Sequence, residues 1–219
     1  MAATKPLKIG LIIGTTRVHR IGPEVATFIL DTLNRTSPTL QSPQKTTIDR
    51  IDLKDHNLPF FDEPIIPKEI HSLSGYHNDH TRLWSQRISS CDAFIFLSAQ
   101  RNWSIPPELK NAIDYLYHEW TGKPAAIFTY GGHGGTQCAE HLRAVLGAMG
   151  VRVLERGVCM AFEGSEFRGN ALAGRVVGLD AAREGGFWAG YRGEFVRVFE
   201  ELVERAGAVR RERENGAVF

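Results

Sequence analysis

Nearly continuous apolar runs recur along this chain, and segments with helical periodicity separate them. Such runs are typical of strands that are buried on both faces of a parallel sheet. Residues 46–53 instead alternate apolar and polar positions, which indicates a strand at the edge of a sheet. The expected strands span residues 8–14, 46–53, 93–97, 125–129 and 151–159.

Apolar residues at helical spacing predict helices after most of these strands. Pro23 and Pro106 fall where a first helical residue is expected, because that position needs no backbone N–H. In one helix, Leu83, Trp84 and Ile88 are expected to form the buried stripe. The expected helices cover residues 23–33, 81–90, 106–116, 136–149 and a final amphipathic segment around 195–203.

This alternation of strands and helices predicts an α/β fold with a parallel sheet and right-handed crossovers. Ligands of such sheets bind at the carboxyl ends of the strands, beside the point where the strand order reverses. Here that point is expected between the first and third strands. The polar turns that follow the first, third and fourth strands should therefore meet at one edge.

Composition limits the classes of protein to consider. The 219 residues carry a formal net charge of +1, which offers no basic surface for nucleic acid. Apolar residues make up 42% of the chain, yet no run approaches the roughly 20 residues that a membrane span needs. Cys91, Cys138 and Cys159 are widely spaced, and the first residues show no secretory signal. We therefore expect a cytoplasmic protein with reduced thiols and no membrane or nucleic-acid partner.

We expect one domain over residues 1–219, with a core at about 8–160 and a helical extension at 161–206. The charged tail, residues 207–219, is predicted to be disordered, and no motif after Phe162 assigns the extension a role. Residues 36–47 are rich in Ser, Thr, Pro and Gln and are predicted to be a flexible connection.

Residues 57–76 combine prolines with aromatic side chains, which predicts an irregular segment. A loop of this length that carries aromatic residues is typical of a binding lid or an interface. Just beyond it, His77 and His80 flank Asp79, but the sequence places no third ligand with them, so we expect no metal site.

The first polar turn has the composition of an anion site. Residues 15–22 contain hydroxyls, two arginines and a glycine immediately before a helix N-terminus. Free backbone N–H groups and the helix dipole attract phosphate there, and guanidinium groups add charge-assisted hydrogen bonds. The spacings of the common nucleotide loops, GxxxxGK[ST] and GxGxxG, are absent. A polar loop with solvated arginines remains the alternative.

Together with the motifs that follow, this turn makes the chain resemble the NAD(P)H-dependent FMN reductase family of flavodoxin-like proteins, which includes small quinone and azo reductases. The similarity covers roughly residues 8–160, beginning with the phosphate motif Gly14-Thr15-Thr16-Arg17. The most specific motif in the family is PEYN, any residue, Ser, any residue, Pro-Gly, and then a helix beginning LKNAID. Here Asn102, Ser104, Pro106 and residues 109–114 match, as does the glycine-rich turn at 131–135.

This resemblance implies a three-layer, doubly wound, five-stranded parallel sheet with a bound FMN. It implies that FMN carries the chemistry, with no catalytic residue, and that NADPH or NADH is the co-substrate. Electrons would pass in a ping-pong cycle to quinones, azo compounds or free flavin, in a homodimer or homotetramer. The implied contacts are Thr15, Arg17, Arg20, Ile21 and Gly22 with the phosphate; Asn102, Trp103, Ser104 and Ile105 with the ring; and Gly131, Gly132, His133, Gly134 and Gly135 with its pyrimidine edge. Gln100, Arg101 and Tyr130 complete the set expected to bind the cofactor.

The chain departs from the motif where Ala99, Gln100 and Arg101 replace Pro, Glu and Tyr, and where Pro107 replaces Gly. Arg101 could stack on the ring, pair with the second phosphate of NADPH, or point to solvent. Backbone N–H groups at the start of the helix after Gly135 are expected to favour negative charge on reduced flavin.

Two other functions stay open, and the altered residues bear on the second of them. One is a flavodoxin-like electron carrier, although such a carrier would favour a strongly acidic surface. The other is a flavin-poor scaffold or binding protein that has kept only the fold.

Overall fold

A parallel sheet forms the centre of the computed structural model, which describes residues 5–41 and 46–216. Its strands are β1 (Leu7–Ile13), β2 (Thr46–Asp52), β3 (Ala93–Ala99), β4 (Pro124–Gly131), β5 (Arg152–Val153) and β6 (Val158–Ala161). Their order is β2-β1-β3-β4-β5, with β6 also paired to β4, and the paired strands run parallel. This order confirms the expected flavodoxin-like α/β fold and the edge position of β2.

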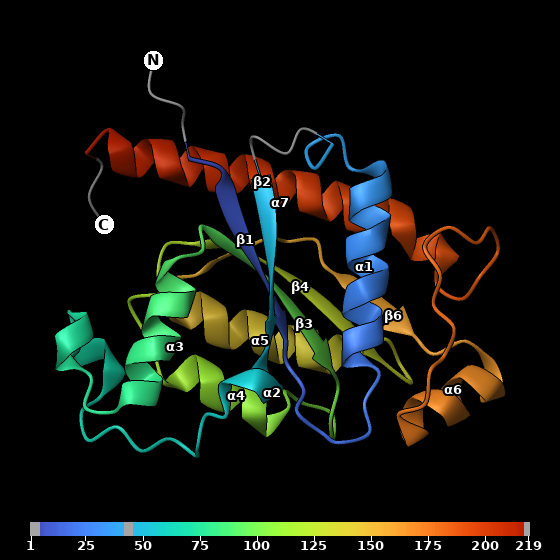
Figure 1. Cartoon of the computed structure of the whole chain (residues 1–219), viewed down its shortest axis with the longest axis horizontal. Helices are drawn as coiled ribbons and strands as arrows, with labels where there is room; N and C mark the ends of the chain where they lie inside the picture. The colour runs from blue at the N-terminus through green and yellow to red at the C-terminus, as the bar shows by residue number, and fades with distance from the viewer. Residues whose placement is uncertain (1–4, 42–45, 217–219) are drawn as a thin grey trace.

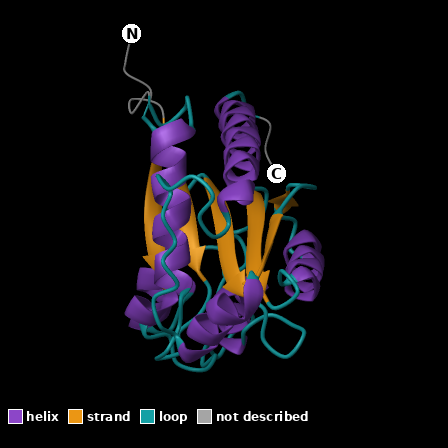
Figure 2. Ribbon diagram, turned by 90° about the vertical axis from the view of Figure 1, so that its right-hand side faces the viewer, coloured by secondary structure: helices purple, strands orange, loops and turns teal. Residues whose placement is uncertain are grey.

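Helices cover both faces of the sheet and make three layers (Figures 1 and 2). One face packs on α1 (Gly22–Thr36) and α7 (Arg192–Glu214), and the other on α3 (Asp79–Ser89), α4 (Pro107–Asp114) and α5 (Thr136–Ala148). Side chains alternate along a strand, so β3 contributes Ile95 to one core and Phe96 to the other. Two cores of this kind explain the continuous apolar runs.

The expected fifth strand, residues 151–159, is divided into β5 and β6. Between them, the carbonyls of Leu154 and Glu155 accept hydrogen bonds from the Arg143 guanidinium at 2.6 and 2.9 Å. Gly157 approaches β4 so closely that an added Cβ would lie 2.5 Å from the Ile127 carbonyl oxygen. Val153 pairs with Ala125 and Val158 with Phe128, so five steps of this chain face three steps of β4 and two residues are extra. Period-2 patterning does not reveal such a bulge.

The remaining elements are short. They are α2 (Leu53–His56), η1 (Pro67–Glu69), η2 (Leu73–Gly75), α6 (Gly164–Ala173) and η3 (Ala189–Tyr191). Helix α4 begins at Pro107, and Pro106 is its N-cap rather than its first residue. On α3, Trp84 and Ile88 are buried as expected, but Leu83 is 67% exposed.

The prediction that the tail from residue 207 is disordered is wrong, because α7 continues to Glu214. Val209 is buried, and the Arg210 guanidinium donates to the Pro6 carbonyl at 3.2 Å and to Asp92 at 2.6 Å. These contacts hold the last turns of α7 against the amino ends of β1 and β3. Residues 217–219 of the predicted tail lie outside the described residues.

The connection after α1 is described in part. Residues 42–45 lie outside the described residues, whereas Ser37 is buried and donates to Glu200 of α7 at 2.5 Å. In the portion of the chain that is described, no helix has both the length and the apolar character needed to cross a bilayer.

Candidate functional site

Three turns meet at the carboxyl edge of the sheet and line one pocket. They are the phosphate loop (residues 14–22, after β1), the ring turn (residues 100–105, after β3) and the glycine turn (residues 131–135, after β4). The pocket encloses about 660 Å³ including its open mouth. Its lining comprises Thr15, Arg17, Arg20, Ile21, Ala99, Gln100, Arg101, Tyr130, Gly131, Gly132, Phe162, Ala171 and Leu172.

The structure thus brings much of the predicted site together and leaves part of it outside. Predicted residues that do not line the pocket are Gly22, Asn102, Trp103, Ser104, Ile105, His133, Gly134 and Gly135. Most of these shape the turns rather than the pocket wall. Gly22 is an example, because an added Cβ there would lie 2.9 Å from Thr15 Oγ1.

The phosphate loop presents a buried hydroxyl at the pocket. Thr15 is 3% exposed, and its Oγ1 has no hydrogen bond of regular geometry within the described part of the chain; the Tyr130 hydroxyl lies beside it and interacts with it. Burial raises the pKa of Tyr130 to about 12, so its hydroxyl stays protonated at neutral pH. A buried polar atom without a regular hydrogen bond is costly, which favours a ligand group there.

The two arginines of the phosphate loop have different partners. Arg20 forms a bidentate ion pair with Asp52, with both distances 2.8 Å, and donates to the Thr15 carbonyl at 2.5 Å. Its charge is therefore balanced, and it braces the loop. Arg17 donates to the carbonyls of His19 and Leu172, and no carboxylate among the described residues pairs with it. Arg17 thus brings the uncompensated positive charge of this loop.

The ring turn keeps a tight, regular shape despite its altered sequence. Arg101 and Ser104 exchange backbone hydrogen bonds of 3.0 and 2.9 Å. Asn102 and Trp103 between them take φ of 46° and 62°. Two successive left-handed residues are the pattern of a type I′ turn, and asparagine tolerates the first position well. The backbone of the turn therefore does not depend on the residues that differ from the family motif.

Arg101 forms a bidentate ion pair with Glu108 of α4, with both distances 3.0 Å, a partner that the sequence does not predict. The same Glu108 carboxylate accepts the backbone N–H of Thr16 at 3.0 Å. One side chain therefore joins the ring turn to the phosphate loop. The Glu108 side chain is only 16% exposed, which reduces solvent screening of the pair.

The glycine turn leaves space at one position and is closely packed at another. An added Cβ at Gly132 would meet no atom within 4 Å, although Gly132 lines the pocket. At Gly135, φ is 79° and an added Cβ would lie 2.8 Å from Thr129 Cβ. Gly135 is thus needed for the fold of the turn, whereas Gly132 keeps the pocket open.

The amino end of α5 has a partner that the sequence does not predict. The Gln100 side-chain oxygen accepts the backbone N–H groups of Gln137 and Cys138 at 3.1 and 3.3 Å. These two N–H groups are therefore occupied and are not free to face a ligand. Gln100, which replaces the family's glutamate, acts instead as a cap that joins the ring turn to α5.

Trp103 and His133 stack on each other outside the pocket, with ring centroids 5.4 Å apart and an interplanar angle of 26°. Trp103 is 60% exposed, and neither side chain lines the pocket. Beside them, Ser104 Oγ lies 2.9 Å from His141 Nδ1. The stacked Trp103 and His133 bridge the ring turn and the glycine turn without filling the space between them.

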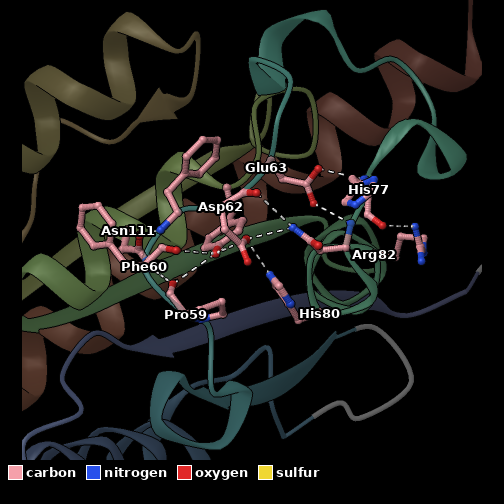
Figure 3. Close-up of polar contacts among 11 residues, drawn as sticks. Pro59, Phe60, Asp62, Glu63, His77, His80, Arg82 and Asn111 are labelled. Atoms are coloured by element: carbon pink, nitrogen blue, oxygen red, sulfur yellow. Dashed lines mark hydrogen bonds and ion pairs between the residues drawn. The ribbon is translucent and has the colours of Figure 1, made fainter.

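The aromatic loop, residues 59–63, is clamped onto α4 (Figure 3). Asn111 accepts the Phe61 N–H at 2.9 Å and donates to the Pro59 carbonyl at 2.7 Å. Tyr115 and His80 contact the Asp62 carboxylate at 2.9 and 3.0 Å. The loop is therefore held in place while leaving Phe60 88% exposed beside α4.

The pKa values of two groups in this clamp, Tyr115 and Asp62, are shifted in the direction that favours the hydrogen bond between them. Burial raises the pKa of Tyr115, and the neighbouring Asp62 carboxylate raises it further. Burial works to raise the pKa of Asp62, but the hydrogen bonds from Tyr115 and His80 outweigh it and lower that pKa. Near neutral pH, the Tyr115 hydroxyl therefore stays protonated and donates a hydrogen bond to the ionised Asp62 carboxylate.

One wall of the pocket could not be predicted from the sequence. Phe162, Ala171 and Leu172 come from the segment around α6, which carries no recognisable motif. Of these, Leu172 is 58% exposed although it is apolar. Only the tertiary contacts reveal this wall, because α6 lies more than a hundred positions from the phosphate loop in the sequence.

The fold and the pocket define a flavodoxin-like protein with a candidate ligand site at the carboxyl edge of its sheet. The family model described as NADPH-dependent FMN reductase matches residues 7–165. The NAD(P)H-dependent FMN reductase LOT6 of Saccharomyces cerevisiae is 39% identical over 150 residues, which cover 68% of this chain and 78% of that protein. An NADPH:quinone oxidoreductase of Arabidopsis thaliana is 29% identical over 150 residues, covering 66% and 69% of the two chains.

The structure of FerB, a flavoenzyme NAD(P)H:(acceptor) oxidoreductase from Paracoccus denitrificans, superposes with a TM-score of 0.63. The match covers 91% of this chain and 98% of the FerB chain at 18% sequence identity, so it supports the flavodoxin-like fold. The chain belongs to the NADPH-dependent FMN reductase family. It is an FMN-dependent oxidoreductase that uses NAD(P)H as its electron donor.

The residues present fit FMN. The buried Thr15 hydroxyl, which has no hydrogen bond of regular geometry, and the uncompensated Arg17 suit a phosphate, and the open space at Gly132 suits a flat ring. Apolar walls from Ile21, Ala99 and the α6 segment suit the less polar parts of the molecule.

Replacing Gly132 by valine tests this fit. The new side chain enters space that no protein atom occupies, so the fold should persist while the FMN dissociation constant rises at least about tenfold through steric overlap. Flavin fluorescence quenching measures the affinity, and circular dichroism checks the fold. Gly147→Val is the matched control, because Gly147 lies far along α5 and an added Cβ there also meets nothing within 4 Å. Unchanged affinity in Gly132→Val would remove the glycine turn from the flavin site.

Proposed function

We propose that the pocket binds FMN with its phosphate at the phosphate loop and its ring between the ring turn and the glycine turn. Electrons then pass from NADPH or NADH to quinones, azo compounds or free flavin in a ping-pong cycle. The observation that carries this proposal is that all three turns line one pocket. Donor and acceptor that share one pocket must bind in turn, which is the structural basis of ping-pong kinetics.

FMN held there would supply the redox chemistry, which is hydride acceptance from a nicotinamide and electron transfer to the acceptor. The protein binds and orients it. Thr15 and Arg17 hold the phosphate, Arg20 braces the loop through Asp52, and Glu108 sets the spacing between the loop and the ring turn. Cys138 remains a neutral thiol because burial raises its pKa to about 11, which argues against covalent catalysis by this residue.

A small-molecule acceptor is supported by the relatives that carry the name quinone oxidoreductase. The carrier and scaffold alternatives are disfavoured by membership of the reductase family and by the open pocket. The cytoplasmic location stays a prediction from the sequence.

Purified protein loaded with FMN should bleach at the flavin absorbance bands when NADPH or NADH is added without oxygen, and a benzoquinone should then restore the colour. Steady-state rates should give parallel double-reciprocal lines. Flavin that NAD(P)H leaves oxidised would favour the electron carrier, and failure to retain flavin would favour the scaffold. Intersecting lines would replace ping-pong with a ternary complex.

Replacing Arg17 by alanine should weaken FMN binding by about tenfold to a hundredfold, because a charge-assisted hydrogen bond to phosphate is lost. Arg17→Lys should recover part of the affinity, since it keeps the charge without the forked geometry. The control is Arg35→Ala, at the exposed end of α1. Titration of the apoprotein with FMN and with riboflavin distinguishes the role, because riboflavin has no phosphate and its affinity should not change.

We also propose a homodimer formed through the aromatic loop and α4, with a homotetramer as the larger alternative. Phe60, Phe61 and Pro107 line an apolar hollow together with Lys110, Asn111 and Asp114 of α4. The clamp by Asn111 and Tyr115 holds Phe60 exposed at this surface. An ordered, exposed phenylalanine next to the helix that follows the ring turn suits a subunit contact close to the flavin.

Phe60→Ser should raise the dimer dissociation constant at least about tenfold, because a symmetric interface loses two buried rings. Light scattering coupled to size exclusion measures the mass over a dilution series. Val176→Ser is the control, as Val176 is 78% exposed on another surface. A dimer of the same strength in both variants would place the interface elsewhere, and a monomeric parent protein would remove the proposal.

A further inference from the structure

A segment that begins at the end of the family match and continues beyond it lies against the phosphate loop. We call residues 162–179 the C-terminal strap; it contains α6 and ends beyond Gly174. Gly174 has φ of 65°, and an added Cβ there would lie 2.3 Å from the His19 carbonyl carbon and 2.5 Å from the Arg20 nitrogen. Only glycine allows two backbones to approach this closely. The strap and the phosphate loop are therefore in direct backbone contact.

A carboxylate anchors the strap to the helix that follows the phosphate loop. Glu24, in the first turn of α1, accepts the N–H groups of Val177, Gly178 and Leu179 at 3.0, 2.8 and 3.0 Å. Three successive N–H groups that converge on one anion form a nest, and the charge strengthens each hydrogen bond. The far end of the strap is thus fixed to α1 by a local and specific contact.

The near end of the strap is fixed as well. The chain between β6 and α6 is held by Trp188, which is fully buried and donates its indole N–H to the Ala161 carbonyl at 2.6 Å. The backbone N–H of Trp188 donates to Glu163 at 3.0 Å. Both ends of the strap therefore have defined positions relative to the sheet edge.

Between these anchors, the strap forms part of the pocket. Phe162, Ala171 and Leu172 line it, and the Leu172 carbonyl accepts a hydrogen bond from Arg17 at 3.1 Å. Leu172 is 58% exposed, so its side chain lies at the pocket and not in the core. The strap thus stands beside the arginine that carries the free charge of the phosphate loop.

We infer that the C-terminal strap is the wall of the flavin pocket at its phosphate end, where it slows the release of FMN and excludes flavin dinucleotides. A flavin whose phosphate carries a further nucleotide, such as FAD, needs an open path beyond Arg17. Leu172 lines the pocket and Gly174 packs on the backbone of the phosphate loop at His19 and Arg20, so the inference places the strap across that path. This inference rests on the proposed FMN site and assigns a role to a segment outside the motifs that define the family.

Leu172→Ala tests the wall directly. Removing the side chain that lines the pocket should raise the FMN release rate about tenfold and improve FAD affinity relative to FMN by a similar factor. Val176→Ala is the control, because Val176 is on the same strap, is 78% exposed and does not line the pocket. Release is followed by the return of flavin fluorescence after dilution, and both flavins are titrated into the apoprotein.

Glu24→Gln tests the anchor. Loss of the charge should loosen the strap, so that trypsin cuts at Arg168 and Arg175 several-fold faster and FMN leaves faster. Asp31→Asn is the control, since Asp31 is an exposed residue of the same helix and undergoes the same change of charge. Thermal unfolding checks that both variants are folded. If Glu24→Gln does not fold, Leu172→Ala alone decides whether the strap forms a wall of the pocket.

The outcomes separate this inference from the proposed function. If the parent protein binds FMN and Leu172→Ala matches it in FMN release and FAD affinity, the strap is not a wall and the flavin site stands. If the parent protein binds FMN and FAD equally well, the exclusion role is overturned. If the parent protein binds no flavin, the proposed function fails and this inference fails with it.

Discussion

Side-chain oxygens that accept backbone N–H groups hold the loops of this site in place. Glu108 accepts from Thr16 in the phosphate loop, Gln100 accepts from the start of α5, and Glu24 accepts from the C-terminal strap. The sheet brings the turns to one edge, but turns of this kind have few hydrogen bonds of their own. A carboxylate or amide from a neighbouring element supplies the missing partner and fixes the distance between two loops. The shape of the pocket follows from these contacts between loops.

The same contacts decide the charge of the site. Two of the three arginines that line the pocket are neutralised, Arg20 by Asp52 and Arg101 by Glu108. Arg17 contacts carbonyl oxygens, so it is the arginine of this lining whose charge is available to an anion. Desolvated ion pairs such as these contribute geometry more than net stability. A site rich in arginine thus has its free positive charge concentrated at the phosphate end.

The altered ring turn shows why the family motif tolerates substitution. The turn is defined by the backbone pairing of Arg101 with Ser104 and by left-handed residues at Asn102 and Trp103. Where the family has a tyrosine, Arg101 is accommodated because Glu108 lies within reach on α4. The motif therefore reflects a backbone shape. Its side chains can change when a neighbouring residue provides a partner for the new side chain.

The sequence by itself determined the sheet, its order of strands and helices, and the edge at which the site forms. These features depend on local periodicity and on the rule that parallel strands end together, as the apolar runs before Gly14, Gln100 and Gly132 illustrate. Only the tertiary structure decided the partners of Arg20 and Arg101, the bulge at Gly157, the full length of α7 and the wall formed by Leu172. Each of these depends on contacts between residues that are distant in the chain, and periodicity carries no information about which distant groups will meet.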